Sequence, residues 1–158
     1  MKKLIYAFIL LSSTLSYGSL NSPVPSSIDE LSIMNSHYVD DTKKLVRGMN
    51  PLGKVGELVD FGITDILIFK NQTKSEIDQE YDELAKVTST INTLQIDFLW
   101  HAYPSYKFAC EQTIDALRMM RSVSESRDRK LFFHCTVGED RTGYLSGLWR
   151  MLKSKWNT

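Results

Sequence analysis

The stretch of residues 131–152 constrains the fold more than any other part of the chain. Three apolar residues, Leu131 to Phe133, precede the segment His-Cys-Thr-Val-Gly-Glu-Asp-Arg-Thr-Gly at 134–143. The residues after that segment are apolar at helical spacing. This pattern predicts a buried strand, a tight loop and a helix, with Cys135 at the end of the strand and Arg141 at the start of the helix.

A loop of this kind is suited to bind an anion. Successive backbone N–H groups in a tight loop converge on one point, and the N-terminus of the following helix adds unpaired donors and partial positive charge. The guanidinium of Arg141 can hold two oxygens of the anion at once. The bound anion would lie over the sulfur of Cys135, which the same field favours as a thiolate. A thiolate beneath a bound phosphate is the arrangement for covalent phosphoryl transfer.

The remaining positions of the loop have supporting roles in this hypothesis. The hydroxyl of Thr142 is expected to donate a hydrogen bond to the sulfur when the sulfur departs, and glycine at 138 supplies backbone freedom. The residues expected to line the bound substrate are Thr136, Val137, Gly138, Glu139 and Asp140.

The motif His-Cys-x5-Arg-Thr resembles the signature loop of the protein tyrosine phosphatase superfamily, which uses a cysteinyl-phosphate intermediate. The version at 134–143 is most similar to loops of bacterial dual-specificity, lipid and inositol phosphatases, including phytases, although Glu139 stands where lysine is common. The resemblance covers about Tyr38 to Trp156. It implies a phosphomonoesterase that acts on inositol polyphosphates. The alternatives are a tyrosine, dual-specificity or phosphoinositide phosphatase, and a non-catalytic phosphate-binding module.

Strand and helix patterns alternate along the chain and predict an α/β domain with a central, largely parallel sheet flanked by helices. This is also the fold that the resemblance implies. The expected strands are 44–47, 63–69, 93–98 and 131–133, and the expected helices are 52–61, 75–88, 104–120 and 142 onward. Sites in such sheets lie at the carboxyl ends of the strands. Lys70, Asp97 and Cys135 are therefore expected at one edge of the sheet.

Breaking a phosphate ester requires a proton for the leaving oxygen. The family supplies it from an aspartate on a loop before the signature strand, and Asp97 resembles that aspartate. His101 in the same loop and Asp140 in the signature loop are the other candidates for the general acid. The choice among the three stays open at this point.

Basic residues outside the loop are candidates for binding further phosphate groups of the substrate. Lys70 is the best placed of them because it follows a strand at the active edge, and His101 is assigned to substrate binding as well. The other basic candidates are Arg47, Lys74 and Lys107. The acidic side chains of Glu139 and Asp140 make the edge less positive, which disfavours very highly charged substrates.

The N-terminus predicts export. Residues 1–18 combine two lysines, a short apolar run and small residues, which is typical of a secretory signal peptide cut after Gly18. Residues 19–36 are expected to form a linker and 37–158 the phosphatase domain, in a periplasmic or extracellular bacterial protein. Family members usually carry further helices after the last one here, so 37–158 is either a minimal or a truncated domain.

Composition excludes several classes of function. Nineteen basic and nineteen acidic residues give a formal net charge of zero, which argues against nucleic acid as a partner. The apolar N-terminal run is too short for a stable membrane span. Three scattered histidines and two cysteines predict no metal site, and no cofactor is expected. Cys110 is interpreted as a small buried side chain, with a reversible bridge to Cys135 as the alternative.

Overall fold

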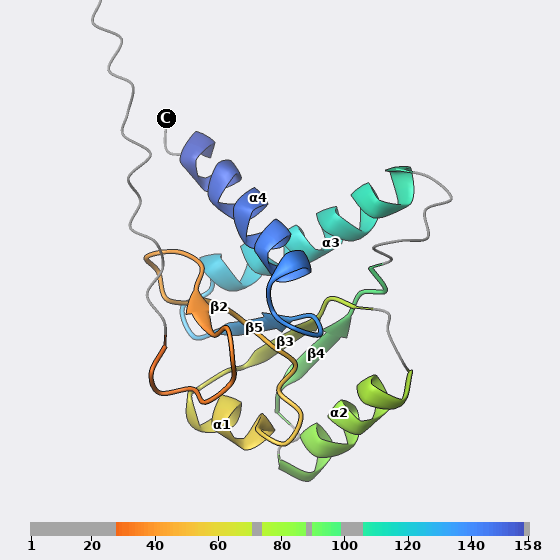
Figure 1. Cartoon of the computed structure of the whole chain (residues 1–158). Helices are drawn as coiled ribbons and strands as arrows, with labels where there is room; N and C mark the ends of the chain where they lie inside the picture. The colour runs from red at the N-terminus through yellow and green to blue at the C-terminus, as the bar shows by residue number, and fades with distance from the viewer. Residues whose placement is uncertain (1–27, 71–73, 88–89, 99–105, 157–158) are drawn as a thin grey trace, which may run out of the picture.

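The computed structural model of the chain describes residues 28–70, 74–87, 90–98 and 106–156 (Figure 1). Its strands are β1 (His37–Tyr38), β2 (Leu45–Gly48), β3 (Asp65–Ile68), β4 (Asn92–Gln95) and β5 (Leu131–His134). Its helices are α1 (Val55–Asp60), α2 (Lys74–Val87), α3 (Tyr106–Glu125) and α4 (Asp140–Trp156). The alternation of strands and helices confirms the predicted α/β class.

The strands form one sheet in the order β1-β2-β5-β3-β4. β1 pairs antiparallel with β2, and the remaining neighbours are parallel. The register places Gly48, His134, Ile68 and Gln95 side by side at the carboxyl ends of their strands. The segments that follow these four residues therefore leave the sheet at one edge.

Side chains alternate along each strand between two hydrophobic layers. In β3, Ile66 and Ile68 pack in one layer and Leu67 in the other, while in β5 Phe132 and Phe133 divide in the same way. Helices α1 and α2 cover the first face of the sheet, and α3 and α4 cover the second (Figure 1). Burial on both faces explains why the central strands are almost entirely apolar.

The end of α1 is set by Gly62. Gly62 has a φ of +79°, which favours glycine, and the amide of Ile63 donates to the carbonyl of Leu58 at 2.9 Å. This is the hydrogen-bond pattern of a helix that ends at a left-handed glycine. The chain turns there and enters β3.

Helix α4 is fixed near its middle by a buried tryptophan. Trp149 is 1% exposed, and its Nε1 donates to Oδ2 of Asp40 at 2.8 Å. Asp40 lies in the turn between β1 and β2, so this bond ties the helix to the edge of the sheet.

Residues 28–36 lie in the stretch that was expected to be a linker, but they pack against the domain. Ile28, Leu31 and Ile33 are each about 95% or more buried, in the same layer as α1 and α2. Their apolar side chains recur at irregular intervals, in turns rather than a helix, which is why periodicity did not reveal them. The packed domain thus includes residue 28 onward.

Two helices have features that the sequence did not predict. Helix α3 continues to Glu125, past its predicted end at residue 120, because Val123 is fully buried and Arg121 pairs with Glu125 one turn away at 2.7 Å. In α2 the buried face contains Glu80, whereas the neighbouring Tyr81 is 38% exposed. The acidic residue inside that face belongs to the site described next.

Candidate active site

The cysteine lies at the floor of a loop between β5 and α4, as the sequence predicted. Cys135 follows the last residue of β5, is 5% exposed and has a free thiol. Its Sγ accepts a hydrogen bond from the amide of Gly138 at 3.4 Å, so the loop folds back over the sulfur. Arg141 lies in the first turn of α4 and is 7% exposed. We call residues 135–141 the anion loop.

Gly138 allows the anion loop to fold in this way. Its φ is +82°, a conformation that other residues rarely adopt. A Cβ at this position would lie 2.4 Å from the carbonyl carbon of Gly48 and 2.5 Å from the amide nitrogen of Met49. The loop therefore presses directly on the backbone that follows β2, and only glycine fits between them.

Polar contacts from the N-terminal part of the domain hold the outside of the anion loop. Nδ2 of Asn35 donates to the carbonyl of Val137 at 2.9 Å and to Oε1 of Glu139 at 3.2 Å. The amide of Asn50 donates to the carbonyl of Thr136 at 3.2 Å. These bonds occupy the carbonyls of Thr136 and Val137 and hold the loop in its folded-back shape.

Behind the anion loop, His134 bridges the catalytic strand to α2. Its Nδ1 lies 3.0 Å from the carbonyl oxygen of Cys135, and its Nε2 lies 2.8 Å from Oε1 of Glu80. Both side chains are fully buried. The bridge fixes the backbone carbonyl of the cysteine, and hence the start of the loop, to a helix on the opposite side of the sheet from α4.

A second arginine lies close to the anion loop. Arg47 on β2 is half-buried, and burial lowers its pKa, while the negative charges of Cys135 and Glu139 act in the opposite direction. Its Nη1 is 3.4 Å from the point that a Cβ on Gly143 would occupy. Arg47 was one of several basic residues considered from the sequence, and the structure places its guanidinium against the first turn of α4.

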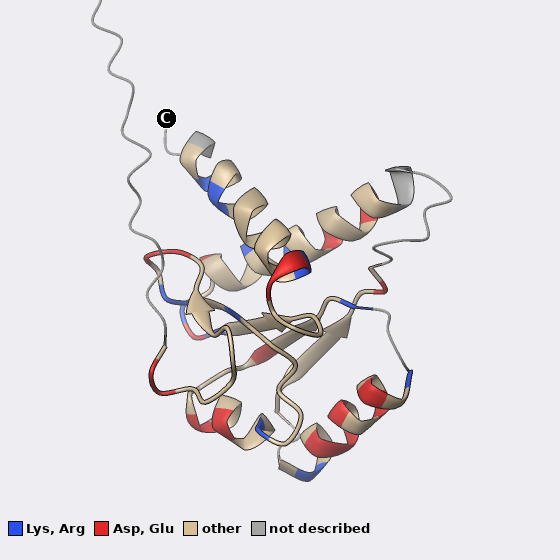
Figure 2. Cartoon of the chain, in the orientation of Figure 1, with Lys and Arg blue, Asp and Glu red and all other residues tan. Residues whose placement is uncertain are grey.

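The remaining residues of the predicted loop are placed as follows. Thr142 is fully buried, and its hydroxyl donates to the carbonyl of Glu139 at 3.5 Å. That bond differs from the predicted one to sulfur. Thr136, Val137, Glu139 and Asp140 are exposed. Figure 2 shows the acidic first turn of α4 directly beside the loop.

Lys70 and Asp97 both lie at the active edge but in different surroundings. Lys70 is fully buried, and its Nζ is 3.3 Å from Oε2 of Glu76, so its ammonium faces α2 in this structure. Asp97 is exposed just beyond β4, and its Oδ1 accepts from Nε2 of Gln95 at 2.7 Å. β4 is two strands from β5, which corresponds to about 10 Å across the sheet. His101 and Lys107 lie where the structure describes no side chains.

Sequence reasoning did not find Asn35 or Glu80. Asn35 lies a hundred residues from the loop it supports, in a turn where its own φ is +59°, and no motif marks it. The sequence does contain a signal for Glu80, because this residue lies three residues after Ile77 and four before Leu84 in α2. A carboxylate between two core residues of a helix indicates a buried partner.

These features coincide with a known family. A family model described as the tyrosine phosphatase family matches residues 40–152. The chain belongs to the tyrosine phosphatase family. The match includes β2, the anion loop and most of α4, and it confirms the predicted superfamily. No curated protein sequence gives a significant match.

Solved structures support the same fold. A DUF442 protein from Shewanella putrefaciens CN-32, described as a candidate phosphatase, aligns with a TM-score of 0.61 at 14% identity, over 82% of this chain and 79% of its own. The core catalytic domain of the inositol pyrophosphate phosphatase SIW14 from Saccharomyces cerevisiae, in complex with citrate, aligns with a TM-score of 0.56 at 20% identity, over 82% and 70%. These likenesses establish a phosphatase fold of the tyrosine phosphatase type.

Within the described residues, no group of three or more histidine, cysteine or acidic side chains is arranged to hold a metal ion. No helix in those segments has the length and hydropathy of a membrane span. Cys110 is exposed rather than buried as the sequence suggested, and both cysteines are free thiols.

Proposed function

We propose that this member of the tyrosine phosphatase family is an exported, cysteine-dependent phosphomonoesterase that hydrolyses inositol polyphosphates. The observation that carries the proposal is the anion loop itself. The sulfur of Cys135 accepts from the Gly138 amide at 3.4 Å, and the loop runs directly into the buried Arg141 at the start of a helix. A non-catalytic binding module would not need the thiol at this position.

The reaction follows from these groups. The Cys135 thiolate attacks phosphorus while the amides and Arg141 hold the non-bridging oxygens. The ester bond breaks, and the leaving oxygen takes a proton from Asp97. A water molecule then attacks the thiophosphate, gives its proton to the Asp97 carboxylate and releases phosphate as the P–S bond breaks. The thiolate is regenerated, so the cycle needs no cofactor.

Three lines of support favour inositol polyphosphates as substrates. The similar catalytic domain of SIW14 is that of an inositol pyrophosphate phosphatase. A signal peptide at 1–18, which lies outside the described residues, would place the enzyme away from the phosphoproteins of its own cell, where a phosphate-rich nutrient is available as a substrate. Arg47 beside the anion loop adds local positive charge in a chain of zero net charge.

A phosphate-release panel tests this function. Purified protein is assayed with p-nitrophenyl phosphate, inositol hexakisphosphate, a phosphotyrosine peptide and phosphoinositide vesicles. We expect turnover of inositol hexakisphosphate with the highest kcat/KM, and complete loss of all activity in Cys135→Ser. The matched control is Cys110→Ser on the exposed face of α3, which should keep the activity.

The family match favours one second candidate, a phosphatase for phosphotyrosine proteins. If the phosphotyrosine peptide is the best substrate in the panel, this second function replaces the first. If Cys135→Ser keeps full phosphatase activity, the cysteine mechanism is wrong. Export is tested separately by sequencing the N-terminus of the mature protein, which is expected to begin at Ser19.

A further inference from the structure

The residue expected to act as general acid is held by the helix that precedes β5. Gln112 lies in α3 and is half-buried, and its Nε2 donates a hydrogen bond to the backbone carbonyl of Asp97. The carboxylate of Asp97 is held separately, because its Oδ1 accepts from Nε2 of Gln95 at 2.7 Å. The backbone and the side chain of Asp97 therefore each have a defined place at the active edge of the sheet.

The next residue fixes the same segment on its apolar side. Phe98 is 2% exposed, and its ring stacks on those of Phe69 and Tyr144, at centroid distances of 4.4 Å and 6.0 Å. Tyr144 lies in α4, three residues after Arg141, and its hydroxyl is 3.3 Å from Oγ1 of Thr113 on α3. The segment after β4 is thus packed against the helix that holds the arginine of the anion loop.

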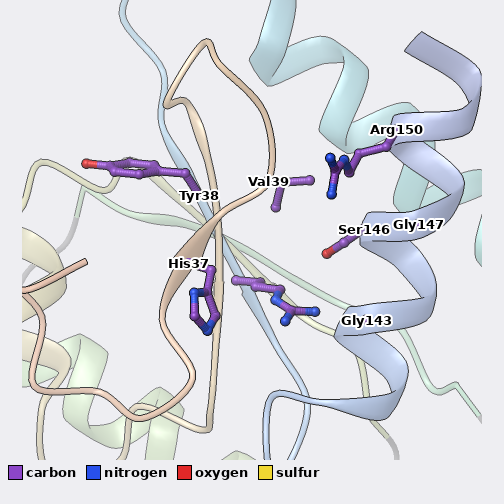
Figure 3. Close-up of a pocket in the computed structure, with 8 residues that line it drawn as sticks. His37, Tyr38, Val39, Gly143, Ser146, Gly147 and Arg150 are labelled. Carbon is purple, nitrogen blue, oxygen red and sulfur yellow. The ribbon is translucent and has the colours of Figure 1, made fainter. Parts of the chain in front are cut away.

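The start of α4 makes these contacts on one side only. Gly143 and Ser146 line a cavity between α4 and the strands β1 and β2 (Figure 3). Tyr144 projects about 100° further round the helix than Gly143, and it contacts α3 and Phe98 instead. The segment that carries Asp97 is therefore connected to the start of α4 by packed side chains as well as through the sheet.

The hydrogen bonding of Gln112 is incomplete. Its Oε1 is buried and has no hydrogen-bond partner within the part of the chain that the structure describes. One intramolecular hydrogen bond makes a small net contribution to stability, and a buried polar atom without a partner costs a comparable free energy or more. The side chain of Gln112 should therefore add little to the stability of the fold, so its bond to Asp97 is its main effect.

We propose that Gln112 is a positioning residue for the reaction, which holds the backbone of Asp97 so that the carboxyl group can protonate the leaving oxygen. The proposal rests on the proposed function and adds to it a residue that acts through Asp97. A general acid must lie within hydrogen-bond reach of the oxygen that it protonates, and a displacement of about 1 Å can lower the rate about a hundred-fold. Loss of the Gln112 bond should weaken proton donation and leave the anion loop unchanged.

Aryl phosphates with different leaving groups test this role. Phenyl phosphate has a poor leaving group and needs the proton more than p-nitrophenyl phosphate, whose leaving group is stable as an anion. Gln112→Met keeps the length of the side chain and removes the donor. We expect kcat to fall about ten-fold on phenyl phosphate and less than about two-fold on p-nitrophenyl phosphate. Inhibition by inorganic phosphate and the urea midpoint of unfolding should stay as in wild type. Gln79→Met on the exposed face of α2 is the matched control and should change none of these values.

A double variant shows whether Gln112 acts through Asp97. In the Asp97→Asn background, Gln112→Met should cause no further loss on phenyl phosphate, because the proton donor is already absent. Equal losses on both aryl phosphates, no loss on either, or additive losses in the double variant would overturn the proposal. An Asp97→Asn variant that keeps the wild-type kcat on phenyl phosphate would overturn it as well.

The same aryl phosphates separate this role from the choice of substrate. If inositol hexakisphosphate is not hydrolysed while Gln112→Met acts on phenyl phosphate as expected, the proposed substrate is wrong and the role of Gln112 stands. If inositol hexakisphosphate is hydrolysed and Gln112→Met matches wild type on every substrate, the proposed function stands and the role of Gln112 is wrong. A wild-type protein that hydrolyses no phosphate ester would overturn both.

Discussion

Nε2 of His134 on β5 lies 2.8 Å from Oε1 of Glu80 on α2, and both side chains are fully buried. The other ring nitrogen faces the carbonyl oxygen of Cys135, which can only accept, so Nδ1 carries a proton. One more proton must then lie between Nε2 and Oε1. The pair is either an imidazolium with a carboxylate or two neutral groups, and its net charge is zero in both cases. This explains how a carboxylate is tolerated in the core.

Replacing Glu80 tests this arrangement. Glu80→Leu leaves Nε2 buried without a partner, so we expect the free energy of unfolding to fall by about 1–3 kcal/mol. Glu80→Gln can still donate to Nε2 and should lose less. Denaturant unfolding followed by circular dichroism measures both values. Asp82→Asn on the exposed face of α2 is the control. A Leu variant as stable as wild type would show that the pair contributes nothing to the fold.

The packing of Gly138 predicts a strong effect of one methyl group. Gly138→Ala places a Cβ 2.4 Å from the Gly48 backbone at a φ that disfavours alanine. We expect the anion loop to shift and kcat/KM for p-nitrophenyl phosphate to fall about a hundred-fold. Gly56→Ala, in a helix and with nothing within 4 Å of the added Cβ, should keep activity and raise stability by about 0.5–1 kcal/mol. Equal activity of both variants would contradict the packing argument.

The acid stability of the fold should depend on Asp65. This buried carboxylate accepts from Nε of Arg129 at 3.0 Å and from Oγ1 of Thr64 at 2.7 Å. Burial alone would raise the pKa of Asp65, but these hydrogen bonds and the charge of Arg129 outweigh it, so the pKa lies below its ordinary value. A carboxyl group with a lowered folded-state pKa stabilises the protein above its unfolded pKa, and this contribution disappears as pH falls through the folded pKa.

We therefore expect Asp65→Asn to lower the free energy of unfolding near pH 7 by about 3 kcal/mol, since it leaves Arg129 without its partner. The difference from wild type should begin to shrink below about pH 4, the ordinary pKa of an aspartate, and continue to shrink at lower pH. Urea unfolding at several pH values provides the measurement. Asp115→Asn removes the exposed ion pair with Arg118 and should change the free energy of unfolding by less than about 1 kcal/mol at every pH. A pH-independent difference for Asp65→Asn would refute the linkage.

Kinetics of three variants test Asp97 as the general acid. Asp97→Asn should reduce kcat at least about ten-fold on inositol phosphates, whose alkoxide leaving group needs a proton. On p-nitrophenyl phosphate, whose leaving group is stable as an anion, the loss should be smaller. His101→Ala and Asp140→Asn are measured in parallel. If kcat falls sharply in either of these two variants while the kcat of Asp97→Asn stays near that of wild type, the proton comes from the residue replaced in that variant.

Local patterns were sufficient to predict the sheet and the anion loop. Strands such as β3 and β5 are runs of apolar residues buried on both faces, and the glycine and arginine of the loop lie within a few residues of the cysteine they serve. The short β1 escaped detection because His37 and Tyr38 form only two residues at an edge, with no alternation to recognise.

The supporting contacts could not be predicted because they join distant parts of the chain. Asn35 contacts Val137, which lies 102 residues later in the sequence. Glu80 on α2 contacts His134, which lies 54 residues later. The extension of α3 was missed for a different reason. Its last turn is polar except for Val123, and a single buried side chain is too little to reveal a helical period.

The bonds that hold the anion loop from outside have a consequence for how an anion is received. Nδ2 of Asn35 donates to the carbonyl of Val137 at 2.9 Å, and the amide of Asn50 donates to the carbonyl of Thr136 at 3.2 Å. With the loop fixed in this way, the receptor for the oxyanion is assembled before any ligand arrives, so little conformational entropy is lost on capture. A synthetic peptide spanning 131–156 would lack both bonds, and it should show no measurable affinity for inorganic phosphate.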